Sequence, residues 1–149
     1  MGQRSHRLCA ARPGEGAKPS AEASIHAAIY RTTGAGAVIH THSPQATALA
    51  TLLGGMAEGI AEFPLGSWEL AKGLGPNGRT SPLPVFPNWD DVPRIAADVD
   101  AYLTPESLPA LLIARHGVTA WGRDLAEARN RLECVESIAQ LILLTGGSG

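Results

Sequence analysis

The sequence feature that most constrains this chain is a short apolar run that leads directly into two histidines. Residues 37–39 read Ala-Val-Ile, and His40 and His42 follow with one threonine between them. Side chains in a strand alternate between its two faces, so His40 and His42 would point to the same side. Ser43 and Pro44 favour the start of a helix. The two imidazoles are therefore predicted at a strand-to-helix junction, a common place for active sites in α/β proteins.

Length and composition exclude several classes of protein. The 149 residues fit one domain, and the apolar fraction of 44% permits a hydrophobic core. A net charge of −2 and few aromatic residues argue against a nucleic-acid or anionic-membrane partner. No apolar run approaches the roughly 20 residues that a membrane-spanning helix needs. Cys9 and Cys134 lie far apart and form no C-x-x-C unit, which indicates a reduced, cytoplasmic chain.

Periodicity and turn residues predict one mixed α/β domain over residues 18–149, preceded by a poorly ordered tail at 1–17. Ser20 is predicted to cap the first helix, which Gly34 ends, and Asp90, Asp91 and Asp124 are interpreted as caps of later helices. Further helices or helical turns are predicted over 44–53, 68–74, 92–103 and 125–144. Strands are predicted over 37–40, 59–63, 83–87, 110–114 and 118–121, with those at 59–63 and 83–87 at or near a sheet edge.

A third histidine completes a candidate metal site. His116 follows the apolar run 110–114 and precedes a glycine, which resembles the setting of His40 and His42. Three protein nitrogens with a fourth position open are typical of catalytic zinc, whereas structural zinc usually has four ligands that include cysteines. Chance remains an alternative explanation of the H-x-H pattern taken alone, and the setting of His116 favours a metal. His26 is interpreted as a partly exposed helix residue rather than a ligand.

A metal that polarises a carbonyl group needs a separate proton carrier. Glu22, at a helix start, and Glu69, in the sequence Trp-Glu-Leu-Ala-Lys-Gly, are the candidates. From position alone, the simpler interpretation is a helix-start charge for Glu22 and a solvated helix residue for Glu69. Lys72 and Arg115 are candidates to meet an anionic substrate, although isolated cations are more often surface charges.

Four motifs in the same order resemble the class II aldolase/adducin family. They are PSAE at 19–22, AGAVIHTHSPQATALATL at 35–52, ELAKG at 69–73 and ARHGVTAWGRDLAEA at 114–128. The resemblance extends over nearly all of residues 18–144. The E-x-x-K-G element together with the HTHS pair is most similar to the family's methylthioribulose-1-phosphate dehydratase branch, which belongs to methionine salvage.

The resemblance implies an α/β/α fold around a central, mainly antiparallel sheet. It implies a homotetramer with active sites near the subunit contacts, and a phosphorylated keto-sugar as the substrate. The reaction implied is a zinc-dependent dehydration of 5-methylthioribulose 1-phosphate to 2,3-diketo-5-methylthiopentyl 1-phosphate. A sugar-phosphate aldolase or epimerase of the same family is the alternative enzyme, and a shortened, non-catalytic family member is the alternative from another class.

The resemblance also implies roles for individual residues. It implies that His40, His42 and His116 bind Zn²⁺ and that Glu69 is the acid/base residue. By similarity to the sister aldolases, Glu22 works at the metal and Ser20 lies in the phosphate pocket.

Family members carry a longer segment before the PSAE motif, with an opening helix, several strands and a phosphate-binding loop. Residues 1–18 contain no matching helix, strand pattern or loop. We therefore expect N-terminal strands of the family's sheet to be missing, one sheet edge to be exposed and most of the phosphate site to be lost, while the metal triad is kept.

Overall fold

The computed structural model describes residues 19–54 and 58–146. A five-stranded sheet lies at its centre, in the order β1-β5-β4-β3-β2. Its strands are β1 (Ala37–Thr41), β2 (Ala61–Phe63), β3 (Leu83–Phe86), β4 (Ala110–Ile113) and β5 (Gly117–Gly122). Neighbouring strands pair antiparallel except β3 and β4, which are parallel. The expected mainly antiparallel sheet is confirmed, and β2 is an edge strand as predicted. The predicted tail at 1–17 lies outside the described residues.

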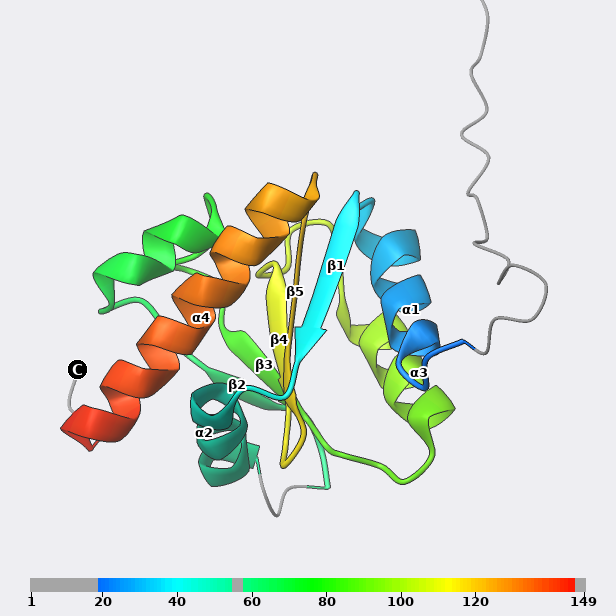
Figure 1. Cartoon of the computed structure of the whole chain (residues 1–149), viewed down its shortest axis with the longest axis horizontal. Coiled ribbons are helices and arrows are strands. Elements are labelled where there is room, and N and C mark those ends of the chain that lie inside the picture. Colours follow the sequence, from blue (N-terminus) through cyan, green and yellow to red (C-terminus); the bar gives the residue numbers. More distant parts are fainter. Residues whose placement is uncertain (1–18, 55–57, 147–149) are drawn as a thin grey trace, which may run out of the picture.

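Helices cover both faces of the sheet, so the α/β/α layering is also confirmed (Figure 1). Apolar side chains of α1 (Ala23–Thr33) and α3 (Val92–Tyr102) pack on one face. The opposite face is covered by α2 (Pro44–Gly54), the 3₁₀ helix η1 (Glu69–Leu74) and α4 (Leu125–Thr145). No helix in the described ranges is long and apolar enough to cross a membrane.

The sequence of β4 explains why the sheet is buried on both sides. Ala110 and Leu112 contribute to the core under α2 and α4, whereas Leu111 and Ile113 contribute to the core under α1 and α3. Alternation sends successive side chains to opposite faces, and both faces are covered, so every position is apolar. This buried strand places the turn that follows it, and therefore His116, at a defined end of the sheet.

The helix ends agree with the predicted caps at α4 but differ at α1. The Asp124 carboxylate accepts the backbone N–H of Glu127 at 2.8 Å, as expected for an N-cap. The prediction that Ser20 caps α1 is wrong, because α1 begins at Ala23 with Glu22 at the N-cap position. The Ser20 hydroxyl instead accepts the backbone N–H of Glu22 at 3.2 Å, which forms a short turn before the helix.

Candidate metal centre

Three imidazole rings form a nearly equilateral triangle at one end of the sheet. The ring centroids are 4.9 Å apart for His40 and His42, 5.0 Å for His40 and His116, and 4.8 Å for His42 and His116. One nitrogen from each ring lies within 4.8 Å of the other two. Because β1 ends as α2 begins, His40 and His42 sit at the strand-to-helix junction. The three rings can therefore converge on one cation.

The pairing of β1 with β5 sets the position of His40. His40 lies opposite Thr119 in the antiparallel register, and its Nδ1 is 3.0 Å from the Thr119 Oγ1. The other ring nitrogen, Nε2, is buried and has no hydrogen-bond partner. A hydrogen bond at one imidazole nitrogen fixes which nitrogen remains available to a metal. The orientation of His40 thus leaves Nε2 as the metal-binding atom.

Burial keeps His40 neutral. Loss of hydration, and to a lesser extent the positive charge that His116, His42 and His26 would carry when protonated, together lower the pKa of His40 to about 4. A neutral imidazole has the free lone pair that metal binding needs. Near neutral pH, His40 is therefore ready to act as a ligand.

The turn between β4 and β5 delivers His116. Arg115, inside this turn, has a φ of 57°, and the backbone N–H of His116 donates to the Ile113 carbonyl at 3.1 Å. Nδ1 of His116 is 3.2 Å from the Asn88 Oδ1. Because a carboxamide oxygen only accepts, this contact places the hydrogen on Nδ1 and leaves the Nε2 lone pair free. His116 is therefore oriented in the same manner as His40.

Close packing joins the two segments that carry the ligands. A Cβ at Gly117 would overlap the carbonyl of Thr41, so the backbone of β5 approaches the end of β1 more closely than a side chain allows. This approach explains the glycine directly after His116.

Glu22 lies beside the triad. Its Oε1 is 3.3 Å from Nε2 of His116, and the two side chains are only 16% and 15% exposed. The other carboxylate oxygen of Glu22 is buried without a hydrogen-bond partner. The structure therefore places Glu22 against His116, and Ser20 is linked to Glu22 through its hydrogen bond with the Glu22 backbone N–H.

These donors fit a divalent cation. Buried polar atoms are normally hydrogen-bonded, and one left without a partner costs free energy. Here Nε2 of His40 is such an atom within the triad, and Oε2 of Glu22 is another, on the carboxylate whose Oε1 contacts His116. Three histidine nitrogens with a further position open are the ligand set of catalytic zinc sites. The group is therefore suited to hold a metal ion.

A cavity of ≈ 690 Å³ opens next to the triad. It is lined by His42 between β1 and α2, by α2 residues Pro44, Thr47, Ala48, Thr51 and Leu52, and by Arg115 and His116 of the β4–β5 turn. The predicted substrate-binding residue Arg115 thus lies at the same cavity as two of the histidines. A cation at this position suits an anionic group of a substrate.

Glu69 and Lys72 lie elsewhere in the chain. The Lys72 Nζ is 2.7 Å from the Glu69 Oε1, and the two side chains are 58% and 79% exposed. Hydrogen bonding and attraction to Lys72 lower the pKa of Glu69. In Figure 1, η1 (green) lies beside α4, on the other side of that helix from α2. Neither residue is among those that line the cavity beside the triad. Within one chain, the structure does not bring Glu69 to the histidines.

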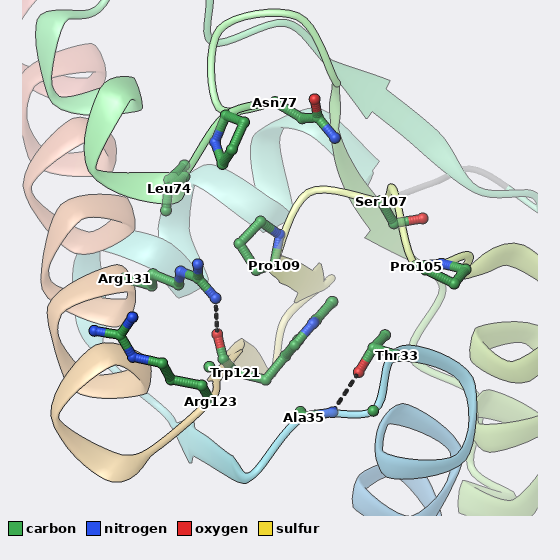
Figure 2. A pocket seen from close by; sticks show the side chains of 13 residues that line it. Thr33, Ala35, Leu74, Asn77, Pro105, Ser107, Pro109, Trp121, Arg123 and Arg131 are labelled. Carbon is green, nitrogen blue, oxygen red and sulfur yellow. Dashed lines mark hydrogen bonds between the residues drawn. The ribbon is translucent and has the colours of Figure 1, made fainter.

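A second cavity, of ≈ 270 Å³, lies at the opposite end of β1 (Figure 2). Its charged groups already have protein partners. Arg131 donates to the Trp121 carbonyl at 3.0 Å and is 3.2 Å from the Glu127 carboxylate. Arg123 is 3.5 Å from the Asp124 carboxylate. None of the residues predicted to act in catalysis or binding lines this cavity.

Sequence reasoning missed several residues around the triad. Thr119 could have been found by aligning β1 with β5, because its register places it opposite His40. His26 is the partly exposed helix residue that was predicted, although its Nε2 atom is buried without a hydrogen-bond partner and burial lowers its pKa. Asn88 lies in a loop and carries no sequence signal. Glu136 of α4, which bonds the first turn of α2, also carries no sequence signal.

Comparisons with known proteins identify the family of the chain. Residues 6–143 match the family model described as the class II aldolase and adducin N-terminal domain. A Nocardia farcinica protein named probable bifunctional methylthioribose-1-phosphate isomerase/methylthioribulose-1-phosphate dehydratase is 51% identical over 137 residues, which cover 90% of this chain and 25% of that protein. The methylthioribulose-1-phosphate dehydratase of Sorangium cellulosum is 39% identical, with 88% of this chain and 62% of that protein covered.

Solved structures are similar as well. The Escherichia coli protein YgbL, described as a putative aldolase/epimerase/decarboxylase, superposes with a TM-score of 0.70 at 32% identity, covering 90% of this chain and 61% of that one. An L-fuculose 1-phosphate aldolase gives a TM-score of 0.67 at 26% identity, covering 86% and 54%. The chain thus spans between a quarter and three-fifths of the length of these relatives. The match of the family model over most of its length shows that the chain belongs to the class II aldolase and adducin N-terminal domain family.

Proposed function

We propose that this chain carries the metal centre of a zinc-dependent methylthioribulose-1-phosphate dehydratase. This hydro-lyase removes water from 5-methylthioribulose 1-phosphate to give 2,3-diketo-5-methylthiopentyl 1-phosphate, a step of methionine salvage in the cytoplasm. The observation that carries the proposal is the histidine triad, in which His40 Nε2 is buried and without a partner. Similarity to relatives that bear the dehydratase name supports the choice of reaction.

Each residue around the triad has a task in this reaction. Zn²⁺, when bound, supplies Lewis-acid polarisation of the substrate's carbonyl and hydroxyl oxygens. His40, His42 and His116 hold it, and the Nδ1 contacts of His40 and His116 keep their Nε2 atoms available. Glu22 adds negative charge beside His116.

Two residues are proposed to meet the substrate phosphate. Arg115 supplies positive charge at the cavity beside the triad. Ser20 lies next to Glu22 and offers a hydroxyl group to the phosphate from that side. Lys72 is proposed to contact the substrate from the same element as Glu69.

Glu69 is proposed as the acid/base residue that moves the proton needed for the substrate hydroxyl to leave as water. Because η1 packs on α4 and Glu69 is exposed, we propose that Glu69 acts at the metal centre of a neighbouring copy in a homotetramer. Lys72 favours the ionised carboxylate, since it lowers the pKa of Glu69. The glutamate is then able to accept a proton first and return it to the leaving hydroxyl.

Assays of zinc and turnover test the reaction. The zinc-loaded protein is expected to convert 5-methylthioribulose 1-phosphate to the diketone phosphate, and the metal-stripped protein is not. Glu69→Gln should keep zinc and lose turnover, while the matched exposed variant Glu133→Gln should keep both. Unaltered turnover in Glu69→Gln would remove Glu69 from the acid/base role. A well-folded chain that holds less than about one metal ion in ten copies would favour a non-catalytic family member.

Mixing two inactive variants tests the placement of Glu69. Glu69→Gln keeps intact histidines, and His116→Ala keeps an intact glutamate. In randomly mixed oligomers with sites between neighbours, half of the histidine sets and half of the glutamates are intact, so about a quarter of the wild-type activity should return. If mixing restores no activity although mixed oligomers form, Glu69 does not act across the subunit contact.

The position of Glu22 favours one second candidate, a sugar-phosphate aldolase or epimerase. Glu22 lies next to His116 and away from Glu69, which leaves a carboxylate at the triad itself. A panel of sugar 1-phosphates separates the two reactions. Carbon–carbon cleavage or epimerisation without loss of water would support the second candidate.

A further inference from the structure

One carboxylate ties the helix that follows the histidine pair to the longest helix of the chain. Oε2 of Glu136, on α4, accepts the hydroxyl hydrogen of Ser43 at 2.6 Å and the backbone N–H of Ala46 at 3.2 Å. Both contacts are partly buried, and they span 93 and 90 positions of the sequence. The first backbone N–H groups of a helix have no partner inside the helix. Here a side chain from α4 supplies one, in place of a cap from the preceding residue.

The contact between Glu136 and Ser43 matters because, in the part of the chain that the structure describes, no hydrogen bond holds the His42 ring. Thr119 and Asn88 hold the rings of His40 and His116. Among the described residues, no hydrogen bond reaches the His42 side chain, which is exposed and lies just past the end of β1. The position of its ring therefore depends on the backbone between β1 and α2. Ser43 is the next residue in that backbone, and it is the residue that Glu136 holds.

We propose that Glu136 is a positioning residue for the metal centre, which fixes the start of α2 and thereby keeps His42 in line with His40 and His116. The inference rests on the proposed role of the triad in holding zinc. A carboxylate also suits this place electrostatically, because the positive end of the α2 dipole lies at its first turn. Glu136 is not among the residues that line the cavity beside the triad, and its hydrogen bonds go to Ser43 and Ala46 rather than to an imidazole.

Four variants separate this role from other contributions of Glu136. Glu136→Ala removes both hydrogen bonds and is expected to weaken zinc binding by up to about 10-fold, which is no more than the loss of a direct partner of a metal-bound histidine. Glu136→Gln keeps an oxygen that accepts from both groups and should stay within about threefold of wild type. Ser43→Ala removes one bond and should fall between them. Glu133→Ala, one turn earlier on α4 and paired with Arg129 at the surface, is the matched control.

The readouts are zinc affinity, by competition with a chromophoric chelator, and the visible absorption of the Co²⁺-loaded protein. Loss of His42 from the metal changes the cobalt spectrum. A contribution of Glu136 to folding alone lowers the melting temperature of the variant but leaves the spectrum and the zinc affinity of the folded protein unchanged. That second result overturns the proposal, and the same criterion applied to Ser43→Ala decides the matter if Glu136→Ala does not fold.

The test also separates this inference from the proposed function. If the wild-type chain binds no zinc, the proposed function fails first. If wild type and Glu136→Ala bind zinc equally well, only the positioning role fails. The outcome does not depend on which sugar phosphate the enzyme converts, because neither readout uses a substrate.

Discussion

Two regions that carry family motifs differ in how they are built. At the histidine triad the side chains of His116 and Glu22 are only 15% and 16% exposed, and buried atoms of His40 and Glu22 have no hydrogen-bond partner. At η1, Glu69 and Lys72 are exposed and pair with each other. A buried polar atom without a hydrogen-bond partner lowers the stability of the folded chain, whereas an exposed ion pair changes that stability little.

The difference indicates which part of the proposed active site one chain forms by itself and which part requires a neighbouring chain. The contacts that orient the rings of His40 and His116 come from the same chain. Lys72 favours the ionised form of Glu69, but Glu69 does not line the cavity beside the histidines of its own chain. This contrast is why we place the metal half of the proposed reaction in one copy and the proton-transfer half in its neighbour.

The largest effect that distinguishes the two regions is expected when one histidine is removed. His116→Ala leaves two imidazoles, which is too few to hold zinc tightly, so the zinc content should fall from about one ion per chain to below about a tenth of that. Glu69→Gln, at the other region, should keep a full complement. Elemental analysis of both folded variants measures this, and equal zinc content would contradict the assignment of the two regions.

Removal of an outer contact should have a smaller effect. Asn88→Ala frees Nδ1 of His116 and leaves the ring itself in place. We expect zinc affinity to fall about 10-fold or somewhat more, as for other partners of metal-bound histidines. A chelator competition assay measures the change. Asn77→Ala, which alters another loop amide that bonds a backbone carbonyl, is the control and should match wild type.

Acid should weaken the metal-free protein through His40. Its pKa of about 4 in the folded chain lies below its ordinary value of 6.5. As the pH falls below 6.5, His40 becomes protonated in the unfolded chain. In the folded chain, His40 stays neutral until the pH approaches about 4. The free energy of unfolding should therefore drop across this window, on the order of 2 kcal/mol after allowance for partial exposure. Urea titrations at several pH values measure it, and His40→Gln should show a shallower slope.

The smallest effect on stability is expected at the exposed pair. Lys72→Met should leave the melting temperature unchanged, because both partners are exposed and screened by solvent. Loss of Lys72 raises the pKa of Glu69 towards its ordinary value, so the acid limb of the pH–activity profile should move upward. A fall in melting temperature of several degrees would show that η1 depends on this pair.

Most of the fold was predictable because local patterns decide it. The run at 110–114 is apolar at every position, and such a strand must be covered on both faces. The start of α1 was predicted wrongly, because Ser20 caps a turn rather than the helix. A good capping residue specifies a local hydrogen bond, and it does not specify how many residues separate that bond from the first helical turn.

The candidate site was predictable only in part. His40 and His42 share a strand face, which follows from a period of two, and His116 stood out by its setting. The residues that orient them come from other elements, and Asn88 reaches His116 across 28 positions of sequence. Such contacts depend on the register and loop path of the folded chain, which one sequence does not reveal.

The close approach of Gly117 to Thr41 has a consequence for how the metal ion is exchanged. Because backbone packing joins the two ligand-bearing segments, we expect the binding site to persist without a bound ion. Ions should then enter and leave without global unfolding of the chain. A larger residue at Gly117 would make the arrangement of the ligands, and hence the lifetime of the bound ion, depend on the ion itself.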